Sequence, residues 1–312
     1  MSIDRVGTNA AAQLLLAQIK IAESRLDQSN RQVSSGHVAD NYAGYAGKTA
    51  ALEGARTAAS RAEADFATAN EAARRLDLQD NLVTQLSDLG NDVRQAITDA
   101  VANGNGASLM TQLQGYFDQA VQILNAKDGD TYIFAGEKDG TAPVTTATLG
   151  DLAALPAASD AFVNGSVKRS MRIGQGQTVE VGQLASDLGT QLFALFRDVA
   201  QFDSGVNGPF GTDLTGAQSD FLSTNIKTAA DAAGDINVQA GANGFKYQAV
   251  KDAMDHLHAS STIYKTFVSN IEDVDMAEAV SRLNQNQLAF QASLQVTAKL
   301  NQVSLLDFLP IT

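Results

Sequence analysis

The sequence of 312 residues contains no cysteine and no tryptophan, and only 6% of its residues are aromatic. The absence of cysteine excludes thiolate catalysis, disulfide bonds and cysteine-ligated metal sites. With so few aromatic side chains, a hydrophobic core has to be built mainly from Ala, Leu and Val. The length suffices for two or three domains, and 44% hydrophobic residues can supply the cores.

Basic side chains are also scarce. The 22 Lys and Arg residues stand against 35 Asp and Glu, which gives a formal net charge of −13. This excess of negative charge makes nucleic acids and anionic membranes poor partners. No apolar run approaches the roughly 20 residues of a transmembrane helix, so we expect no membrane insertion. The first residues include Asp4 and lack a basic region followed by a cleavage site, so we expect no cleaved signal peptide.

The negative charge is missing from both ends of the chain. Residues 1–33 hold four basic and three acidic side chains, and residues 276–312 hold two of each. The ends together carry +1, so the middle of the chain carries −14. Like charges would repeat at every contact between identical copies, so nearly neutral ends suit a dense assembly of copies.

The N-terminal segment has the apolar spacing of a coiled coil. Steps of three and four residues predict one helix that ends near Gly36, a natural C-cap. The positions on this stripe are Ala12, Leu15, Ile19, Ala22, Leu26, Ser29 and Val33.

The C-terminal segment keeps the same spacing without charge. No ionisable side chain lies between Arg282 and Lys299, and Asn, Gln, Ser and Thr fill the gaps. Leu288, Val296 and Leu300 lie off the main stripe, so one partner helix cannot cover the apolar surface. We expect the two terminal helices to pair with each other and with further copies, although an ordinary bundle helix is the simpler alternative. The C-terminal stripe comprises Met276, Val280, Leu283, Gln287, Phe290, Leu294, Thr297, Asn301, Ser304 and Phe308.

The middle of the chain is expected to be helical with one insert. Alternating apolar residues over 131–134 and 161–182 predict short strands. The fold class is therefore mainly α, an elongated coiled coil and helix bundle with a small β-rich insert. Three parts are expected: a terminal coiled-coil domain of 1–40 with 273–312, a helical rod of 41–129 with 215–272, and an outer insert of 130–214 containing one helix. Further helices are predicted over 48–101, 107–125, 183–202, 217–238 and 245–269, the last two separated by the Gly-rich stretch 241–244.

Motifs for chemistry are weak throughout. His256 and His258 are two residues apart and do not share a helix face. Tyr132 and Ile133 occupy the positions where a calcium loop needs an oxygen ligand and a glycine. The Asn164-Gly165-Ser166 sequon is a short pattern that occurs often by chance. We therefore expect no catalytic, metal-binding or cofactor-binding residues, no cofactor and no enzymatic activity.

Both ends resemble the bacterial flagellin superfamily. The stretch "IEDVDMAEAVSRLNQNQLAFQASLQVTAKLNQVSLLDFL" resembles that family's carboxyl end, and "RLDQSNRQVSSGHVADNYAGYAG" resembles the turn after its first helix. Val33, His37, Val38 and Asn41 depart from the family's usual residues at that turn. The resemblance implies tubular assembly through the terminal helices, export through the flagellar type III apparatus, and an extracellular location in the flagellum.

Within the superfamily, the middle of the chain is similar to the hook–filament junction proteins. The segment "DGDTYIFAGEKDGTAPV" resembles theirs, with Val144 where Phe is usual. The implied partners are copies of the same chain, neighbouring hook-associated proteins and flagellin, and an export chaperone. Filament flagellin itself is the alternative. A flagellin-like surface protein that binds glycans through Tyr132 or Phe162 is a second alternative, although sugar platforms favour the Trp that this chain lacks.

This interpretation makes the two apolar stripes the predicted assembly residues. On the N-terminal helix they are Leu15, Ile19, Ala22, Leu26 and Val33. On the C-terminal helix they are Val280, Leu283, Gln287, Phe290, Leu294, Thr297, Asn301 and Phe308.

Overall fold

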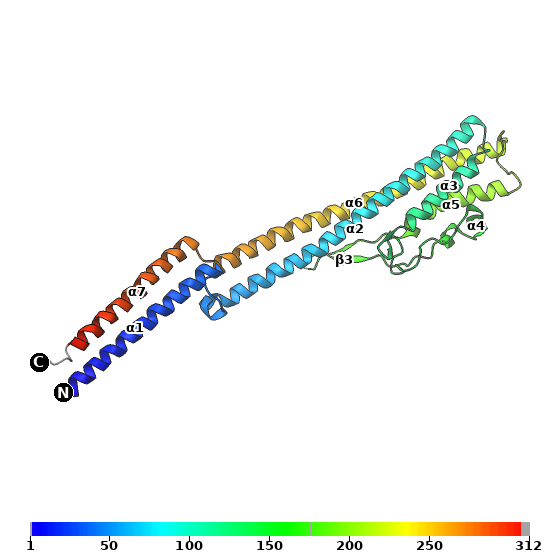
Figure 1. Cartoon of the computed structure of the whole chain (residues 1–312). Helices are drawn as coiled ribbons and strands as arrows, with labels where there is room; N and C mark the ends of the chain where they lie inside the picture. Colours follow the sequence, from blue (N-terminus) through cyan, green and yellow to red (C-terminus); the bar gives the residue numbers. More distant parts are fainter. Residues whose placement is uncertain (1, 175, 307–312) are drawn as a thin grey trace. The chain divides into compact units, whose positions relative to one another are not determined.

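The computed structural model describes residues 2–174 and 176–306, and side chains from Gln13 to Lys299 apart from residue 175 (Figure 1). The chain divides into two compact units. The terminal unit comprises residues 1–61 with 260–312, and the central unit comprises residues 62–259. The division into three parts expected from the sequence stays a prediction.

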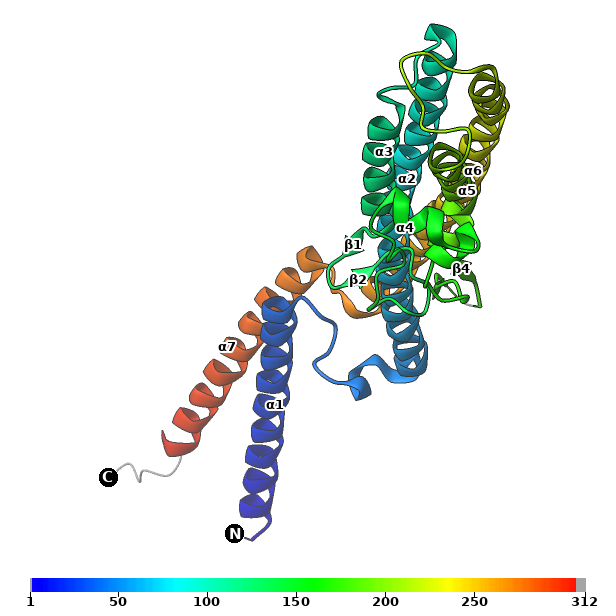
Figure 2. The ribbon, with the colours of Figure 1, turned by 90° about the vertical axis from the view of Figure 1, so that its right-hand side faces the viewer.

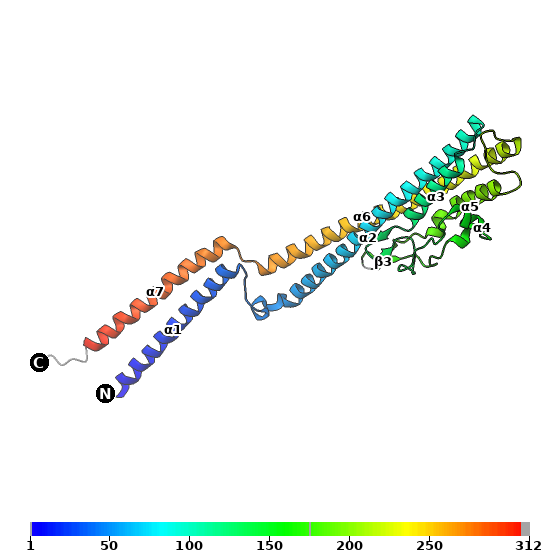
Figure 3. The ribbon, with the colours of Figure 1, turned by 45° about the vertical axis from the view of Figure 1, so that its right-hand side comes forward.

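The terminal unit is built from the two ends of the chain. Helix α1 (Ser2–Ser35) runs antiparallel to helix α7 (Met276–Leu306), and Figures 1 and 3 show the two side by side. The unit also contains η1 (Tyr42–Lys48), the first turns of α2 (Thr49–Asn103) and the last turns of α6 (Gly216–Glu272). The predicted pairing of the two terminal heptad segments is present in the structure.

Helix α1 ends where the sequence predicts. Gly36 has φ +75°, a left-handed conformation that glycine adopts without steric cost, and its N–H donates to the carbonyl of Gln32 at 2.9 Å. The chain therefore leaves the helix at Gly36 and turns toward η1.

The central unit is a helix bundle around a hydrophobic core. Long segments of α2 and α6 lie side by side, and α3 (Leu109–Leu124) and α5 (Ala185–Ser204) pack near them (Figure 2). Two short helices, α4 (Leu149–Ala154) and η2 (Ala158–Ala161), cover α5. Four fully buried aromatic rings help to fill this core: Phe117, Phe134, Phe193 and Phe196.

The strands of the insert are short. Strand β1 (Lys127–Asp128) pairs antiparallel with β2 (Thr131–Tyr132), and β3 (Ser170–Arg172) pairs antiparallel with β4 (Thr178–Glu180). The predicted strand segments are thus present, but most of residues 130–214 consists of loops and of α4, η2 and α5. The expectation of a mainly α fold with a small β element is confirmed.

The predicted break at residues 241–244 is wrong, because α6 continues through it to Glu272. The outward faces of Gly241 and Gly244 meet no other atoms, so these glycines are not required by close packing. Asn243 is 1% exposed, and its side-chain amide donates to the carbonyl of Leu76 on α2 at 2.8 Å. Contacts with α2 therefore maintain the helix where local composition favours a turn. No helix of the described residues is long and apolar enough to cross a membrane.

Candidate assembly surface

The contact between α1 and α7 is a narrow, half-buried stripe. All five N-terminal residues predicted to assemble, Leu15, Ile19, Ala22, Leu26 and Val33, are half-buried, while the side chains beside them are mostly exposed. On α7 the corresponding half-buried residues include Leu283, Phe290 and Thr297. Among residues 13–35 and 276–299, neither helix buries more than one stripe, so this part of the pair has no closed core of its own.

A small polar contact lies within this stripe. The Asn286 amide donates to the Ser29 hydroxyl at 2.7 Å, and the Ser29 hydroxyl donates to the carbonyl of Arg25 at 3.0 Å. Ser29 is 5% exposed, and Ala279 is 1% exposed one heptad from Asn286. Such a polar pair fixes the register of two helices at some cost in stability.

Large apolar side chains remain exposed on both flanks of the stripe. Leu288 is 67% exposed and Leu294 is 45% exposed, and both belong to the uncharged segment of α7. Two shallow grooves follow the α1–α7 contact, one lined by Leu15, Ile19 and Thr297 and the other by Ala22, Asn286 and Ala289. The other exposed apolar residues of the pair are Leu14, Leu16, Ile21, Met276, Val280 and Val296.

A backbone clasp connects the end of α1 with the turn between α6 and α7. Val38 N–H donates to the carbonyl of Glu272 at 2.7 Å, and Val274 N–H donates to the carbonyl of Gly36 at 2.9 Å. Beside these bonds, His37 Nδ1 lies 3.4 Å from Asp273 Oδ1. Arg56 of α2 donates to the carboxylate of Glu272, whose side chain is 8% exposed. The clasp therefore holds the end of α1 beside the start of α7.

Replacing Glu272 by Gln is expected to weaken the clasp by about 1–2 kcal/mol, because the amide removes the negative charge that pairs with Arg56 at a buried position. Amide hydrogen exchange at Val38 and Val274 would measure the effect. Glu53 is a matched control, since its exposed carboxylate lies 3.8 Å from the same Arg56. Glu53→Gln is expected to change protection by less than about 0.5 kcal/mol. Equal effects of the two variants would contradict a structural role for the Glu272 pair.

The structure places the predicted C-terminal residues on two different faces. Leu283, Phe290 and Thr297 face α1, whereas Val280, Gln287 and Leu294 are exposed. The side chain of Asn301 and all of Phe308 lie outside the described part of the chain. The positions that complete the contact with α1 are Ala279, Asn286 and Ser293, each one residue before an exposed one.

The sequence contained a weak signal for these missed residues. Ala279, Asn286 and Ser293 recur every seven residues, as do Val280, Gln287 and Leu294. Either set alternates with Leu283, Phe290 and Thr297 in steps of three and four. Small side chains allow the closer helix approach, so α1 packs on the smaller set and leaves the larger one exposed. Whether the exposed set contacts other copies stays a prediction.

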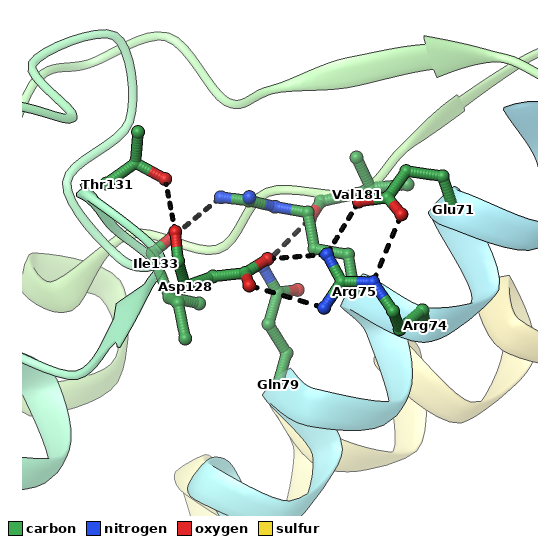
Figure 4. Close-up of polar contacts among 8 residues, drawn as sticks. All are labelled: Glu71, Arg74, Arg75, Gln79, Asp128, Thr131, Ile133 and Val181. Carbon is green, nitrogen blue, oxygen red and sulfur yellow. Dashed lines mark hydrogen bonds and ion pairs between the residues drawn. The ribbon is translucent and has the colours of Figure 1, made fainter.

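In the central unit, a cluster of charges fastens the first hairpin to α2 (Figure 4). Arg74 makes hydrogen bonds to Glu71 at 2.7 Å and to Asp128 at 2.8 Å. The side-chain hydrogen bond from Arg74 lowers the pKa of the Asp128 carboxyl, and the same cause lowers the pKa of Glu71. Lys127 lies over the ring of Tyr132, 4.5 Å from its centroid. The hairpin is thus held by charge as well as by its backbone pairing.

Asp128→Asn is expected to destabilise the central unit by about 0.5–1 kcal/mol near pH 7, since Arg74 is half exposed and solvent screens the pair. A carboxyl with a lowered folded-state pKa contributes stability that is complete above its unfolded pKa. That stability is lost as the pH falls through the folded pKa, so the difference between wild type and Asp128→Asn should shrink as the solution is acidified. Urea unfolding at a series of pH values from neutral to acid tests this. Asp130→Asn, at an exposed position of the same hairpin, is the control, and at pH 7 it should change the unfolding free energy by less than about 0.5 kcal/mol.

Within the described residues, no group of three or more His, Cys, Asp or Glu side chains could hold a metal ion. The Asn164 amide donates to the Ser186 hydroxyl, and its carbonyl accepts from the Ser186 N–H, so the sequon asparagine is engaged in the fold. Phe162 packs on Phe193 with ring centroids 4.9 Å apart, and Lys127 covers one face of Tyr132. Neither ring therefore offers a platform free on both faces for a sugar.

Comparison with known families identifies the C-terminal part of the chain. Residues 226–309 match the family model of the bacterial flagellin C-terminal helical region. The matched segment includes α7 and all but the first turns of α6, so the exposed apolar flank of α7 lies within it. The predicted resemblance to the flagellin superfamily is confirmed. No curated protein matches this sequence.

Two solved structures share the fold over most of the chain. A protein assigned as a flagellar hook-associated protein from Vibrio parahaemolyticus matches with a TM-score of 0.56 and 14% identity, over 71% of this chain and 96% of that one. FlgL from Xanthomonas campestris matches with a TM-score of 0.54 and 12% identity, over 70% of this chain and 99% of that one. At such low identity the likeness concerns the fold.

Proposed function

We propose that this chain is a structural axial protein of the bacterial flagellum that assembles at the junction between hook and filament. The observation that carries the proposal is the uncharged apolar flank of α7, which lies inside the segment matched to flagellin and is not covered by α1. The fold it shares with FlgL and a hook-associated protein supports the junction as the place of assembly.

The physical role of the surface follows from its composition. When a neighbouring copy covers exposed Leu and Val side chains, the free energy falls by roughly 25 cal/mol for each Å² of apolar surface removed from water. Amide and hydroxyl side chains such as Gln287 can form hydrogen bonds in such contacts without the desolvation cost of charges. We propose that Val280, Gln287 and Leu294 contact neighbouring copies, and that Leu283, Phe290 and Thr297 hold α7 on α1.

The finer features of the proposal concern partners and location. The chain would contact copies of itself, a neighbouring hook-associated protein and flagellin, and an export chaperone before assembly. It would be exported without a cleaved signal peptide and act outside the cell. Its terminal coiled-coil domain, 1–40 with 273–312, would form the inner layer, with 41–129 and 215–272 as a rod and 130–214 as the outer insert. No catalytic step belongs to this role.

Filament flagellin is the second candidate, favoured by the match of residues 226–309 to a flagellin family model. Seeded assembly separates the two. Purified protein is added to sheared filament fragments and, in parallel, to isolated hooks, and both are examined by electron microscopy. Binding confined to hook ends supports the junction role. Long new filaments from the fragments would replace it with the flagellin role, and no binding to either would overturn both.

A further inference from the structure

The central unit has two hydrophobic clusters rather than one. The larger begins on α2 at Val83 and reaches Ile236 on α6. The smaller uses α2 up to Leu76 and α6 from Val250 onward, with Ile173 and Val181 of the second hairpin region. Between them, α2 and α6 bury polar side chains instead of apolar ones.

Four residues form this buried polar layer: Arg75, Gln79, Gln183 and Asn243, which are 6%, 0%, 5% and 1% exposed. Hydrogen bonds and closeness in the sequence connect these residues. Gln79 donates to the carbonyl of Val181 at 2.8 Å, and Gln183, two residues further along, donates to the carbonyl of Gln239 at 3.1 Å. Asn243, one turn beyond Gln239, donates to the carbonyl of Leu76 at 2.8 Å. Figure 4 shows Gln79 of α2 bonded to Val181, while the guanidinium of Arg75 on the same helix donates to the carbonyl of Ile133 at 3.3 Å.

Each of the four side chains has one buried polar atom without a hydrogen-bond partner in the described part of the protein. These atoms are Arg75 Nε, Gln79 Oε1, Gln183 Oε1 and Asn243 Oδ1. The amide nitrogens face main-chain carbonyls, so turning an amide over would place oxygen against oxygen. The orientation of the three amides is therefore determined, and three acceptors and one donor need partners from elsewhere.

The balance of donors and acceptors selects the ligand. Water can both accept from Arg75 Nε and donate to amide oxygens, so it matches both kinds of unsatisfied atom in the layer. A cation suits the amide oxygens but is repelled by the buried guanidinium of Arg75. An anion suits Arg75 but finds three acceptors. We propose that the polar layer is a binding site for ordered internal water, which joins α2, α6 and the segment after β4.

Water-selective nuclear Overhauser spectroscopy on the 15N-labelled full chain tests this site. The side-chain amides of Gln79, Gln183 and Asn243 are expected to show cross-peaks to long-lived bound water. Gln218 is an internal control: it is 4% exposed, donates to the carbonyls of Asn207 and Pro209, and accepts from Thr215 N–H. Cross-peaks in the layer no stronger than that of Gln218 would overturn the proposal.

A pair of variants tests whether the water is shared. Gln79→Met keeps the length of the side chain and removes its oxygen, so the water cross-peak of Gln183 should fall by at least about half. Gln218→Met should leave that peak unchanged. An unchanged Gln183 peak in folded Gln79→Met would overturn a single shared layer. If Gln79→Met does not fold, a crystal structure of the wild-type chain decides: water within about 3.2 Å of Arg75 Nε supports the site, and direct pairing of Arg75 with Gln79 overturns it.

Discussion

Replacing Leu294 by Lys is expected to leave the isolated chain folded and to lower its incorporation at the hook end by at least about tenfold. Leu294 is 45% exposed, so in the monomer the new ammonium group can reach water. In an assembly the same group would be buried against a neighbour without a partner. Removing an unpaired charge from water costs several kcal/mol, and each 1.4 kcal/mol is a factor of ten in affinity.

Two matched variants make this result specific to the surface. Val206→Lys places the same charge on a side chain that is 100% exposed in a loop of the central unit, and it should assemble normally. Leu294→Met keeps an apolar side chain of similar volume and should also assemble. Circular dichroism of the monomers checks the fold, and electron microscopy with hook ends measures incorporation. Normal incorporation of folded Leu294→Lys would exclude this face of α7 from the contact between copies.

Much of the helical fold could be predicted from the sequence, because apolar periodicity reports which helix face meets a partner. The stripe from Leu15 to Val33 identified the face of α1 that lies on α7. It was unambiguous because the residues between its members are largely polar or charged. The end of α1 was equally predictable, since Gly36 adopts the positive φ that a helix C-terminus favours.

The C-terminal contact was only half predictable, and the reason is the lack of charge in α7. Without Lys or Glu to mark the solvated side, two overlapping stripes share Leu283, Phe290 and Thr297. Only the approach of α1 selects the set with Ala279, which is 1% exposed, over the set with Val280, which is 42% exposed. That choice depends on helix–helix distance, and a single sequence does not contain it.

Residues 241–244 show that a distant contact can override local propensity. A Gly-Ala-Asn-Gly stretch favours a turn by local propensity, yet α6 passes through it because Asn243 is held by the carbonyl of Leu76. Leu76 and Asn243 are far apart in the sequence, so the partner was invisible until both helices were placed. The buried polar layer is equally hard to predict, since its residues come from segments that are far apart in the sequence.

Phe193→Ala is expected to destabilise the central unit by about 3–5 kcal/mol, the typical cost of a cavity left by a buried aromatic ring. Phe193 is 0% exposed and contacts three other rings, with centroid distances of 4.9 Å to Phe162, 5.2 Å to Phe117 and 6.4 Å to Phe196. Neighbouring Gly189 already allows Phe162 to approach α5 closely, because an added Cβ would lie 2.8 Å from that ring. The rings have little free space into which they could relax, so the cavity should persist.

Phe245→Ala is the matched control, because it removes the same ring from a position on α6 that is 82% exposed. Its effect on urea unfolding is expected to stay within about 0.5 kcal/mol. Similar losses for the two variants would contradict the assignment of Phe193 to the core. Phe193 lies in the central unit and Leu294 in the terminal unit, so the two substitutions should affect different properties of the protein. Phe193→Ala should lower the unfolding free energy while the folded fraction still binds hook ends, whereas Leu294→Lys should preserve the fold and abolish binding.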